Sequence, residues 1–303
     1  MCSLVVSWRD AMRAAPPGES LRGLAGLTPQ RRHPGPRRHD VRMSETTRIC
    51  IAGATGWTGG ALVEGVLDAP DLTLAASVSR SAAGTALGGA PVFGTVAEAL
   101  DAGVDVLVEY TSHEVAKEHV LTAIGRGVPV VIGTSGLTAE DYGEIDAAAR
   151  AAGVGVAASG NFSLTAAMAS AGALLAARHL PSWEVIDFAK ATKPDVPSGT
   201  ARELAERLSA VAPSPVARPL DEIAGPVEAR GATVGAGQVH SVRLPGFVVS
   251  TEVVFGLPDE RLTIRHDAGG TPAPYVAGTL LAARAVRTRV GLTRGLDTLL
   301  LEA

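Results

Sequence analysis

The chain has 303 residues, of which 46% are hydrophobic and 19% charged, so it is long enough to bury the core of one large or two ordinary domains. Its formal net charge of −4 favours neither nucleic acid nor an anionic membrane as a partner, and no apolar run reaches the ~18 residues that span a bilayer. The two cysteines, Cys2 and Cys50, lack metal-site spacing, which predicts a cytoplasmic protein without a structural metal.

Residues 1–46 differ in composition from the rest, because arginine and proline are interleaved through them. Such a segment buries too little apolar surface to order itself, so we expect a disordered tail, with a start at Met43 as one explanation. The apolar run Ser-Leu-Val-Val near its beginning is too short for a secretory signal. An arginine-rich organelle address or an anion-binding arm is the functional alternative.

From Thr47 onward, short apolar runs alternate with alanine-rich helical stretches, as is typical of a parallel sheet with crossover helices. Strands are predicted at residues 48–52, 72–78, 104–109, 128–132 and 154–157. Helices are predicted at residues 60–67, 95–101, 114–126 and 139–152. The pattern predicts an α/β fold with a doubly wound sheet of Rossmann type, forming a dinucleotide-binding domain over residues 47–162.

The order of predicted helices and strands changes after Asn161. We expect helices at residues 164–178 and 198–208, and strands at residues 184–188, 237–243, 248–255 and 261–267. The later strands alternate apolar and polar residues, which predicts a sheet covered on one face in an α+β domain over residues 163–272. A helix at 273–286 is predicted to pack back on the first domain, so that residues 273–303 complete it.

A glycine-rich turn joins the first strand to the first helix. Gly53, Gly56 and Gly59 have the spacing that permits a tight turn, close approach of backbone N–H groups to a pyrophosphate, and helix-to-strand packing. The intervening Thr55, Trp57 and Thr58 are therefore also expected at a dinucleotide. The alternative is a structural turn without a ligand.

The second strand ends in Ser79-Arg80, where an acidic residue would hold a ribose 2′-hydroxyl. Because a guanidinium presents a planar fork of donors to phosphate oxygens, Arg80 with Ser79 favours NADPH as cofactor, with NADH as the lesser alternative. Arg80 would otherwise be an ordinary solvated loop residue.

A second candidate site begins at Lys193. Ser198 is placed as the N-cap of the following helix, and the N–H groups of Gly199 and Thr200 with the hydroxyls of Ser198 and Thr200 predict a carboxylate site at its positive end. Lys193 would add a full charge. The alternative is an ordinary Pro-Ser helix start beside surface lysines.

These residues and several others resemble the dihydrodipicolinate reductase family over nearly all of residues 47–303. The motifs are residues 53–59, Glu109-Tyr110-Thr111, Gly133-Thr134-Ser135-Gly136, Asn161-Phe162-Ser163, residues 193–201 and His240-Ser241-Val242-Arg243-Leu244-Pro245-Gly246. The resemblance implies reduction of a cyclic unsaturated dicarboxylate by NAD(P)H, in a homo-oligomer, tetramer or dimer, assembled through the second domain.

By the same resemblance, several residues are assigned to the two ligands. Those implied at the cofactor are Tyr110, Thr111, Gly133, Ser135, Asn161 and Phe162. Those implied at a substrate carboxylate are Ser135, Lys193, Ser198, Gly199 and Thr200.

Three departures from the family pattern stand out. Ala189 and Lys190 occupy the positions of a His-His pair whose first member is the usual proton donor, Thr271 replaces an arginine, and Trp57 replaces an arginine often found in the glycine turn. Because a placed general acid contributes ~10²–10⁴-fold to rate, its loss favours a changed substrate.

The leading hypothesis is an oxidoreductase in which NADPH reduces a C=N or conjugated C=C bond of a small carboxylated substrate, such as a cyclic imine. Lys193 and Lys190 are the candidate catalytic residues, with Lys190 or water as proton donor; Lys190 would otherwise lie in solvent near the site. The alternatives are the family's usual reaction in lysine biosynthesis, or a non-catalytic NADPH-binding regulator.

Overall fold

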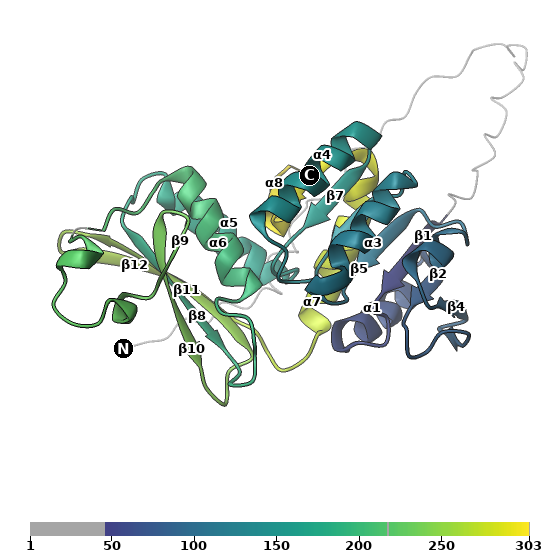
Figure 1. Ribbon diagram of the computed structural model, residues 1–303, viewed down its shortest axis with the longest axis horizontal. Coiled ribbons are helices and arrows are strands. Elements are labelled where there is room, and N and C mark those ends of the chain that lie inside the picture. Colours follow the sequence, from purple (N-terminus) through teal and green to yellow (C-terminus); the bar gives the residue numbers. More distant parts are fainter. Residues whose placement is uncertain (1–45, 217, 303) are drawn as a thin grey trace, which may run out of the picture. The chain divides into compact units, whose positions relative to one another are not determined.

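The computed structural model of the chain describes residues 46–216 and 218–302, which form two β-sheets with flanking helices (Figure 1). The prediction of a disordered tail at 1–46 therefore lies outside the described residues, apart from Thr46.

An eight-stranded sheet is built from strands between Thr47 and Ala158 and from one strand near the end of the described chain. Its strands are β1 (Thr47–Ala52), β2 (Leu72–Val78), β3 (Ala86–Leu87), β4 (Ala90–Phe93), β5 (Val106–Glu109), β6 (Val130–Ile132), β7 (Gly155–Ala158) and β13 (Gly291–Arg294). The order is β13-β7-β6-β5-β1-β2-β4-β3, with every pair parallel except β3–β4. The chain order reverses between β1 and β5, and ligands of open α/β sheets bind beside such a reversal.

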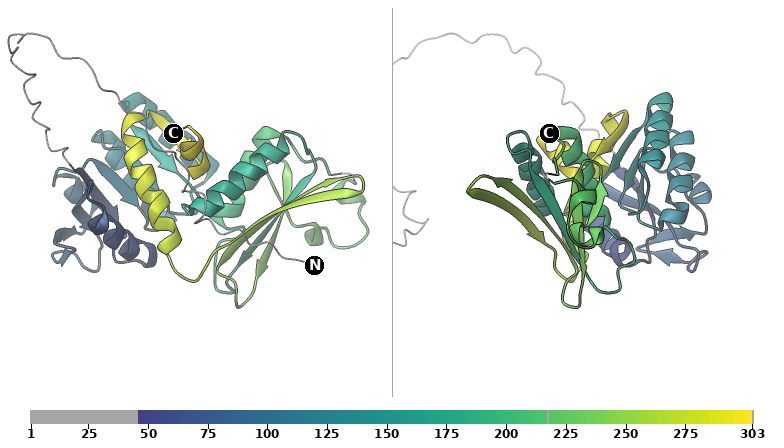
Figure 2. Two further views of the ribbon diagram at one scale, coloured as in Figure 1. Left: turned by 180° about the vertical axis from the view of Figure 1, so that it is seen from behind. Right: turned by 60° about the vertical axis from the view of Figure 1, so that its left-hand side comes forward.

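Helices cover both faces of this sheet. On one face lie α2 (Val96–Leu100), α3 (His113–Gly125) and α4 (Ala139–Ala152), and on the other lie α1 (Trp57–Asp68), α7 (Ala273–Ala285) and α8 (Leu296–Leu301). Figure 2 shows α7 lying along the back of the sheet beside α1. The two helices approach closely at Gly65, where a Cβ atom would lie 2.3 Å from the Val276 side chain.

The second sheet has five strands in the order β12-β11-β8-β10-β9. They are β8 (Trp183–Ala189), β9 (Ala232–Val234), β10 (Gly237–Arg243), β11 (Val249–Leu257) and β12 (Glu260–Asp267). Helices α5 (Leu164–Ala177) and α6 (Gly199–Val211) pack on one face over a core that contains Trp183, Phe255 and Leu208. Three short 3-10 helices, Leu220–Glu222, Val227–Arg230 and Val286–Thr288, complete the described part of the chain.

The predicted fold class, a doubly wound parallel sheet with a second α+β part, is confirmed. The boundaries differ in places: α1 begins at Trp57, three residues earlier than predicted, while β5 and β6 each begin two residues later. Four short strands and α8 were not predicted. Among them, β3 and β4 form a hairpin whose turn, Gly88-Gly89, has φ values of 56° and 82°, as a two-residue turn of this kind requires.

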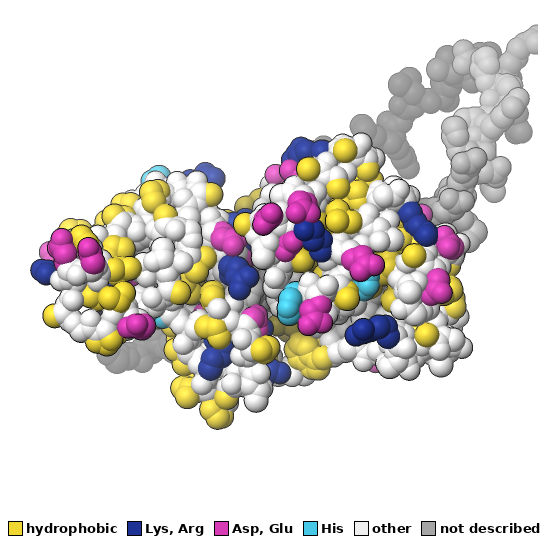
Figure 3. Space-filling model, viewed as in Figure 1, with side chains coloured by type: hydrophobic (Ala, Val, Ile, Leu, Met, Phe, Trp, Pro, Cys, Tyr) yellow, Lys and Arg dark blue, Asp and Glu magenta, His cyan; other side chains and the backbone are white. Residues whose placement is uncertain are grey.

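The face of the molecule drawn in Figure 3 shows no strong separation of charge. On the face in Figure 3, lysine and arginine side chains are interspersed with aspartate and glutamate, and neither sign forms a continuous patch. Among the helices of the described residues, none has both the length and the apolar content needed to cross a bilayer.

Candidate functional site

The glycine turn after β1 lies at the carboxyl edge of the sheet, next to β5. Gly53 has a φ of 84°, and a Cβ there would lie 2.3 Å from the carbonyl oxygen of Tyr110. At Gly59 a Cβ would lie 2.0 Å from the carbonyl oxygen of Gly53. Gly56 is the N-cap of α1 and provides no side-chain cap, so the first N–H groups of this helix face outward without a capping side chain. The turn thus leaves backbone donors open to an anion.

A cavity of about 670 Å³, which we call the turn cavity, opens beside these donors. Among the predicted cofactor residues, its lining includes Gly53, Thr55, Gly56, Ser79, Arg80, Tyr110 and Thr111. The hydroxyls of Thr55 and Ser79 are 2.8 Å apart, which joins the turn to the end of β2. Arg80 is exposed and forms no ion pair with any described residue. Its guanidinium is therefore available at the rim of this cavity.

A buried carboxylate organises the edge of the sheet beneath the turn cavity. Glu109 is fully buried at the end of β5. It accepts hydrogen bonds from the hydroxyls of Thr111 and Thr134, and from the backbone N–H of Thr111 at 3.2 Å. His119, which lines the turn cavity, lies 3.3 Å from the same carboxylate. Glu109 thereby fixes the loops that follow β5 and β6.

A second cavity of about 190 Å³, the central cavity, lies between the first sheet's carboxyl edge and the start of α6. The predicted site residues that line it are Trp57, Thr58, Tyr110, Gly133, Ser135, Asn161, Phe162, Lys193, Ser198, Gly199 and Thr200. Tyr110 lines both cavities, so the two spaces meet at this residue. The two cavities are therefore neighbours along the edge of the sheet.

Contacts with Thr279 and Gly133 fix the position of the Tyr110 side chain. The Tyr110 hydroxyl lies 2.8 Å from the hydroxyl of Thr279 on α7, and burial raises the pKa of Tyr110 well above its usual range. A Cβ at Gly133 would lie 2.0 Å from the Tyr110 ring, so glycine there lets the ring lie against the chain. Asn161 accepts a hydrogen bond from the N–H of Ser163 at 2.9 Å.

The start of α6 faces the central cavity. Ser198 is its N-cap, and its hydroxyl oxygen accepts from the N–H of Ala201 at 3.3 Å, which confirms the predicted cap. The Thr200 hydroxyl donates to the carbonyl oxygen of Gly160 at 2.9 Å. Within the described residues, the N–H groups of Gly199 and Thr200 have no acceptor. These two N–H groups are the free donors of the cradle, whereas both hydroxyls already have partners in the protein.

Beneath this cradle lies Asp187, a fully buried residue of β8. Its carboxylate accepts from the backbone N–H of Ser198 at 2.8 Å and from the Ser198 hydroxyl at 2.6 Å. Arg243 of β10 donates to the same carboxylate at 2.8 Å and to the Asp195 carbonyl oxygen at 2.7 Å. The buried pair therefore fixes both the loop before α6 and the cap residue itself.

The two candidate lysines lie in different surroundings. Lys193 lines the central cavity, and its Nζ is 2.7 Å from Asp195 Oδ1. Lys190 follows Ala189 at the end of β8, is exposed, and is not among the residues that line either cavity. Its role as proton donor stays a prediction.

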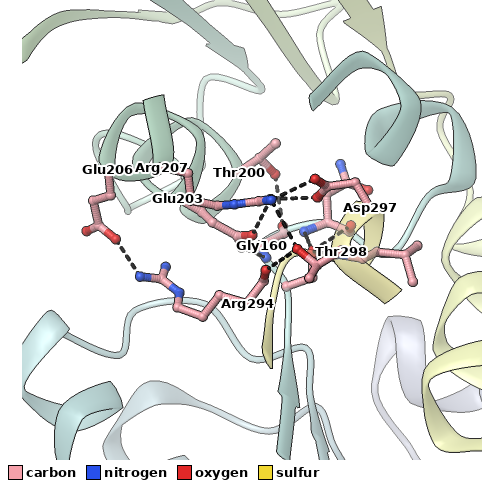
Figure 4. A network of polar contacts seen from close by, with 11 residues as sticks. Gly160, Thr200, Glu203, Glu206, Arg207, Arg294, Asp297 and Thr298 are labelled. Carbon is pink, nitrogen blue, oxygen red and sulfur yellow. Dashed lines mark hydrogen bonds and ion pairs between the residues drawn. The ribbon is translucent and has the colours of Figure 1, made fainter. Parts of the chain in front are cut away.

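A buried ionic network joins α6 to the end of the chain (Figure 4). Arg207 of α6 forms two hydrogen bonds of 2.6 Å with Asp297 of α8, and its Nη1 is 3.5 Å from Glu203 Oε1. Glu203 also accepts from the N–H of Gly160, and burial raises the pKa of Glu203. With the bond from Thr200, both polar groups of the Gly160 backbone are held by α6.

Most of the predicted site residues therefore surround the two cavities. The exceptions are Gly59, which supports the turn through packing, and Lys190. Sequence reasoning missed Glu109 and Asp187 as site supports. The signal for Asp187 was present, because the alternation of β8 places it on the same buried face as Trp183 and Val185. Among the described residues, no group of three or more His, Cys, Asp or Glu side chains is placed to hold a metal.

Comparison with known proteins covers both parts of the chain. Residues 47–162 match the family described as dihydrodipicolinate reductase, N-terminus, and residues 161–300 match dihydrodipicolinate reductase, C-terminus. A 4-hydroxy-tetrahydrodipicolinate reductase from Moorella thermoacetica is 37% identical over 272 residues, covering 85% of this chain and 99% of the relative. The protein of that name from Streptococcus suis is 38% identical over 258 residues, covering 84% and 100%.

A solved structure agrees with these matches. The dipicolinate-bound dihydrodipicolinate reductase from Paenisporosarcina sp. TG-14 has a TM-score of 0.67 and 28% identity, and the match covers 84% of this chain and 99% of that one. The resemblance found in the motifs thus extends over both sheets. The chain belongs to the dihydrodipicolinate reductase family of oxidoreductases.

Proposed function

We propose that the protein is a cytoplasmic NADPH-dependent reductase that acts on a C=N or conjugated C=C bond of a small carboxylated substrate, most simply a cyclic imine. The observation that carries the proposal is the meeting of two cavities at Tyr110, one beside a glycine turn and the other beside a carboxylate cradle. When bound, the cofactor would supply the hydride.

The turn cavity has the features that a dinucleotide phosphate requires. Gly53 and Gly59 stand where a Cβ would collide with backbone, and the uncapped first turn of α1 offers N–H groups to a pyrophosphate. Ser79 and Arg80 would hold the ribose end, and the unpaired guanidinium favours a 2′-phosphate. Tyr110, Gly133, Asn161 and Phe162 would line the nicotinamide end.

In the central cavity, a substrate carboxylate would accept hydrogen bonds from the N–H groups of Gly199 and Thr200 at the positive end of α6. Ser135, against which Gly199 packs, would close one side. Lys193 would pair with the carboxylate and hold a proton at Nζ. Lys190 or water would supply the proton delivered to the reduced bond.

The second candidate function is the reaction of the curated relatives. Their identity of 37–38% over more than four-fifths of this chain favours 4-hydroxy-tetrahydrodipicolinate reduction. Ala189 and Lys190 at the positions of the family's histidine pair argue for a changed substrate instead.

The proposal is tested by following oxidation of NADPH and NADH with a panel of carboxylated cyclic imines, including the substrate of the relatives. Turnover with at least one imine is expected. Lys193→Met should lower kcat/KM by about 10- to 150-fold, as expected for a lost charge-assisted hydrogen bond of ~1.5–3 kcal/mol, without changing cofactor affinity. Lys117→Met, which removes two surface ion pairs, is the matched control. No oxidation of either cofactor with any imine would refute the proposal.

We also infer a homo-oligomer, tetramer or dimer, formed through the face of the five-stranded sheet that α5 and α6 leave open. A cavity of about 580 Å³ on this face is lined by Ile186 and Val254 beside the charged groups of Glu184, Arg230 and His240. Light scattering after size-exclusion chromatography measures the mass directly, and a monomer at micromolar concentration would contradict the inference.

A further inference from the structure

The central cavity is poor in positive charge. Of the fifteen residues that line it, Lys193 is the one lysine or arginine, and its Nζ already lies 2.7 Å from Asp195 Oδ1. Two further free donors in the lining are the N–H groups of Gly199 and Thr200, which are adjacent at the start of α6. The cavity therefore offers one place for a carboxylate.

Aromatic rings occupy other parts of the same lining. Trp57, at the first turn of α1, has 56% of its surface exposed, and its ring meets that of Tyr275 edge to face with centroids 6.1 Å apart. Tyr110 and Phe162 form a second pair, with centroids 6.2 Å apart. Val249 adds an aliphatic side chain. An indole left this exposed on a cavity wall is apolar area that a ligand would remove from water.

A second carboxylate would be unfavourable against this wall. The faces of aromatic rings carry partial negative charge, so they do not replace the water that a carboxylate loses. Thr58, Asn161 and Ser135 supply only neutral groups. Burial of a charge without a cationic partner is strongly disfavoured, whereas a flat apolar ring gains contact with Trp57 and Tyr275.

We propose that the substrate is a monocarboxylate: one carboxylate at Lys193 and the start of α6, and an uncharged planar or aliphatic part against Trp57 and Tyr275. This inference rests on the proposed reductase function and narrows its substrate class. It separates this chain from its relative in Paenisporosarcina, whose structure holds dipicolinate, a ring with two carboxylates.

The inert acids pyridine-2-carboxylate and pyridine-2,6-dicarboxylate test this without any reaction, since they differ only in the second carboxylate. Their affinities for the full-length protein, with NADP⁺ present, are measured by calorimetry and by tryptophan fluorescence. The monoacid should bind at least tenfold more tightly. Equal or tighter binding of the diacid, or no binding of either acid, would overturn the proposal.

Variants at position 57 test whether the aromatic wall causes the preference for the monoacid. With NADP⁺ kept saturating for each variant, Trp57→Ala should weaken monoacid binding roughly tenfold, as expected for loss of a partly buried aromatic contact. Trp57→Arg should reverse the preference by placing a cation on the wall. Leu67→Ala, at an exposed apolar position near the other end of α1, is the matched control and should leave both affinities unchanged. Unchanged monoacid affinity in Trp57→Ala would contradict the placement of the uncharged part of the ligand against Trp57.

Turnover separates this inference from the function on which it rests. Six-membered cyclic imines with one or two carboxylates are compared by kcat/KM, and the monocarboxylate should be favoured at least tenfold. Faster reduction of the dicarboxylate would contradict the proposed monocarboxylate substrate and would still support the reductase function. Tight, selective binding of the monoacid without reduction of any imine would refute the reductase function and keep the ligand class.

Discussion

Asp187 holds Ser198 from below by two hydrogen bonds, one to its backbone N–H at 2.8 Å and one to its hydroxyl at 2.6 Å. A third donor, Arg243, reaches the same carboxylate at 2.8 Å. A carboxylate is an acceptor at every position, so it suits a site at which only donors converge. The position of the α6 cradle therefore depends on a residue that does not touch the cavity.

Asp187→Asn should weaken substrate binding selectively. The NH₂ group of asparagine would face one of the donors, from Ser198 or Arg243, whose hydrogen bonds the carboxylate now accepts. An unmade buried hydrogen bond costs about 1–3 kcal/mol, so we expect KM to rise roughly 5- to 150-fold while cofactor affinity stays unchanged. Steady-state kinetics and a separate cofactor titration measure the two effects. Asp267→Asn, at an exposed position of the same sheet, is the control. A parallel loss of cofactor affinity would show general misfolding instead.

Arg80 should determine the preference for NADPH. Removal of its charge by Arg80→Met is expected to weaken NADPH binding about 10- to 150-fold, the equivalent of ~1.5–3 kcal/mol for a charge-assisted hydrogen bond, and to leave NADH binding unchanged. Fluorescence titration of both cofactors provides the measurement. Arg178→Met, which removes an exposed arginine after α5, should change neither affinity. An equal loss for both cofactors would rule out a 2′-phosphate contact.

Two of the ion pairs in Figure 4, Arg207–Asp297 and Arg294–Glu206, should differ in their contribution to stability. Asp297 is almost fully buried beside Arg207, so Arg207→Met leaves an unpaired charge and should lower the free energy of unfolding by about 3–5 kcal/mol. Arg294 pairs with Glu206 at a more exposed site and lies over the Tyr142 ring, so Arg294→Met should lower it by only about 1–2 kcal/mol. Urea denaturation compares them, and equal losses would contradict the difference in burial.

Cys50 should be unreactive in the folded protein. Burial raises the pKa of its thiol to about 12, so the thiolate is scarce at pH 8. In a Cys2→Ser variant, a thiol reagent at pH 8 should modify nothing until the chain is unfolded, and then modify one group. Rapid labelling of the native protein would show that β1 opens readily.

The same shift has a consequence for stability at alkaline pH. Above about pH 9 the unfolded chain loses the Cys50 proton while the folded chain keeps it, so stability falls as pH rises toward 12. Cys50→Ala should reduce the slope of unfolding free energy against pH in this window. The same slope in both proteins would assign the alkaline loss to other groups.

Local signals accounted for much of what the sequence predicted. The turn at Gly53 and the cap at Ser198 depend on neighbouring residues, so both can be predicted from a short segment of sequence. The tertiary contacts of the same side chains cannot. The Thr200 hydroxyl donates to Gly160, forty residues away, and this bond follows only from the packing of α6 against the loop after β7.

The strand β13 shows a second kind of limit. Its four residues, Gly-Leu-Thr-Arg, carry no strong alternation, and its partner β7 lies more than one hundred residues earlier. Pairing with a distant, already formed edge decides its structure, rather than its own propensity. The burial of Asp187, by contrast, could be predicted from its own strand, because the alternation along β8 places this carboxylate on the buried face.

The position of β13, α7 and α8 also constrains how the protein is made. The first sheet begins at Thr47, yet two of the three helices on one of its faces, α7 and α8, are synthesised only after the whole second sheet. Until then Leu62, Val63 and Val66 of α1 lack the partners that α7 supplies, and the nascent chain exposes them to solvent. The part of the chain that contains the first sheet is therefore translated first and completed last.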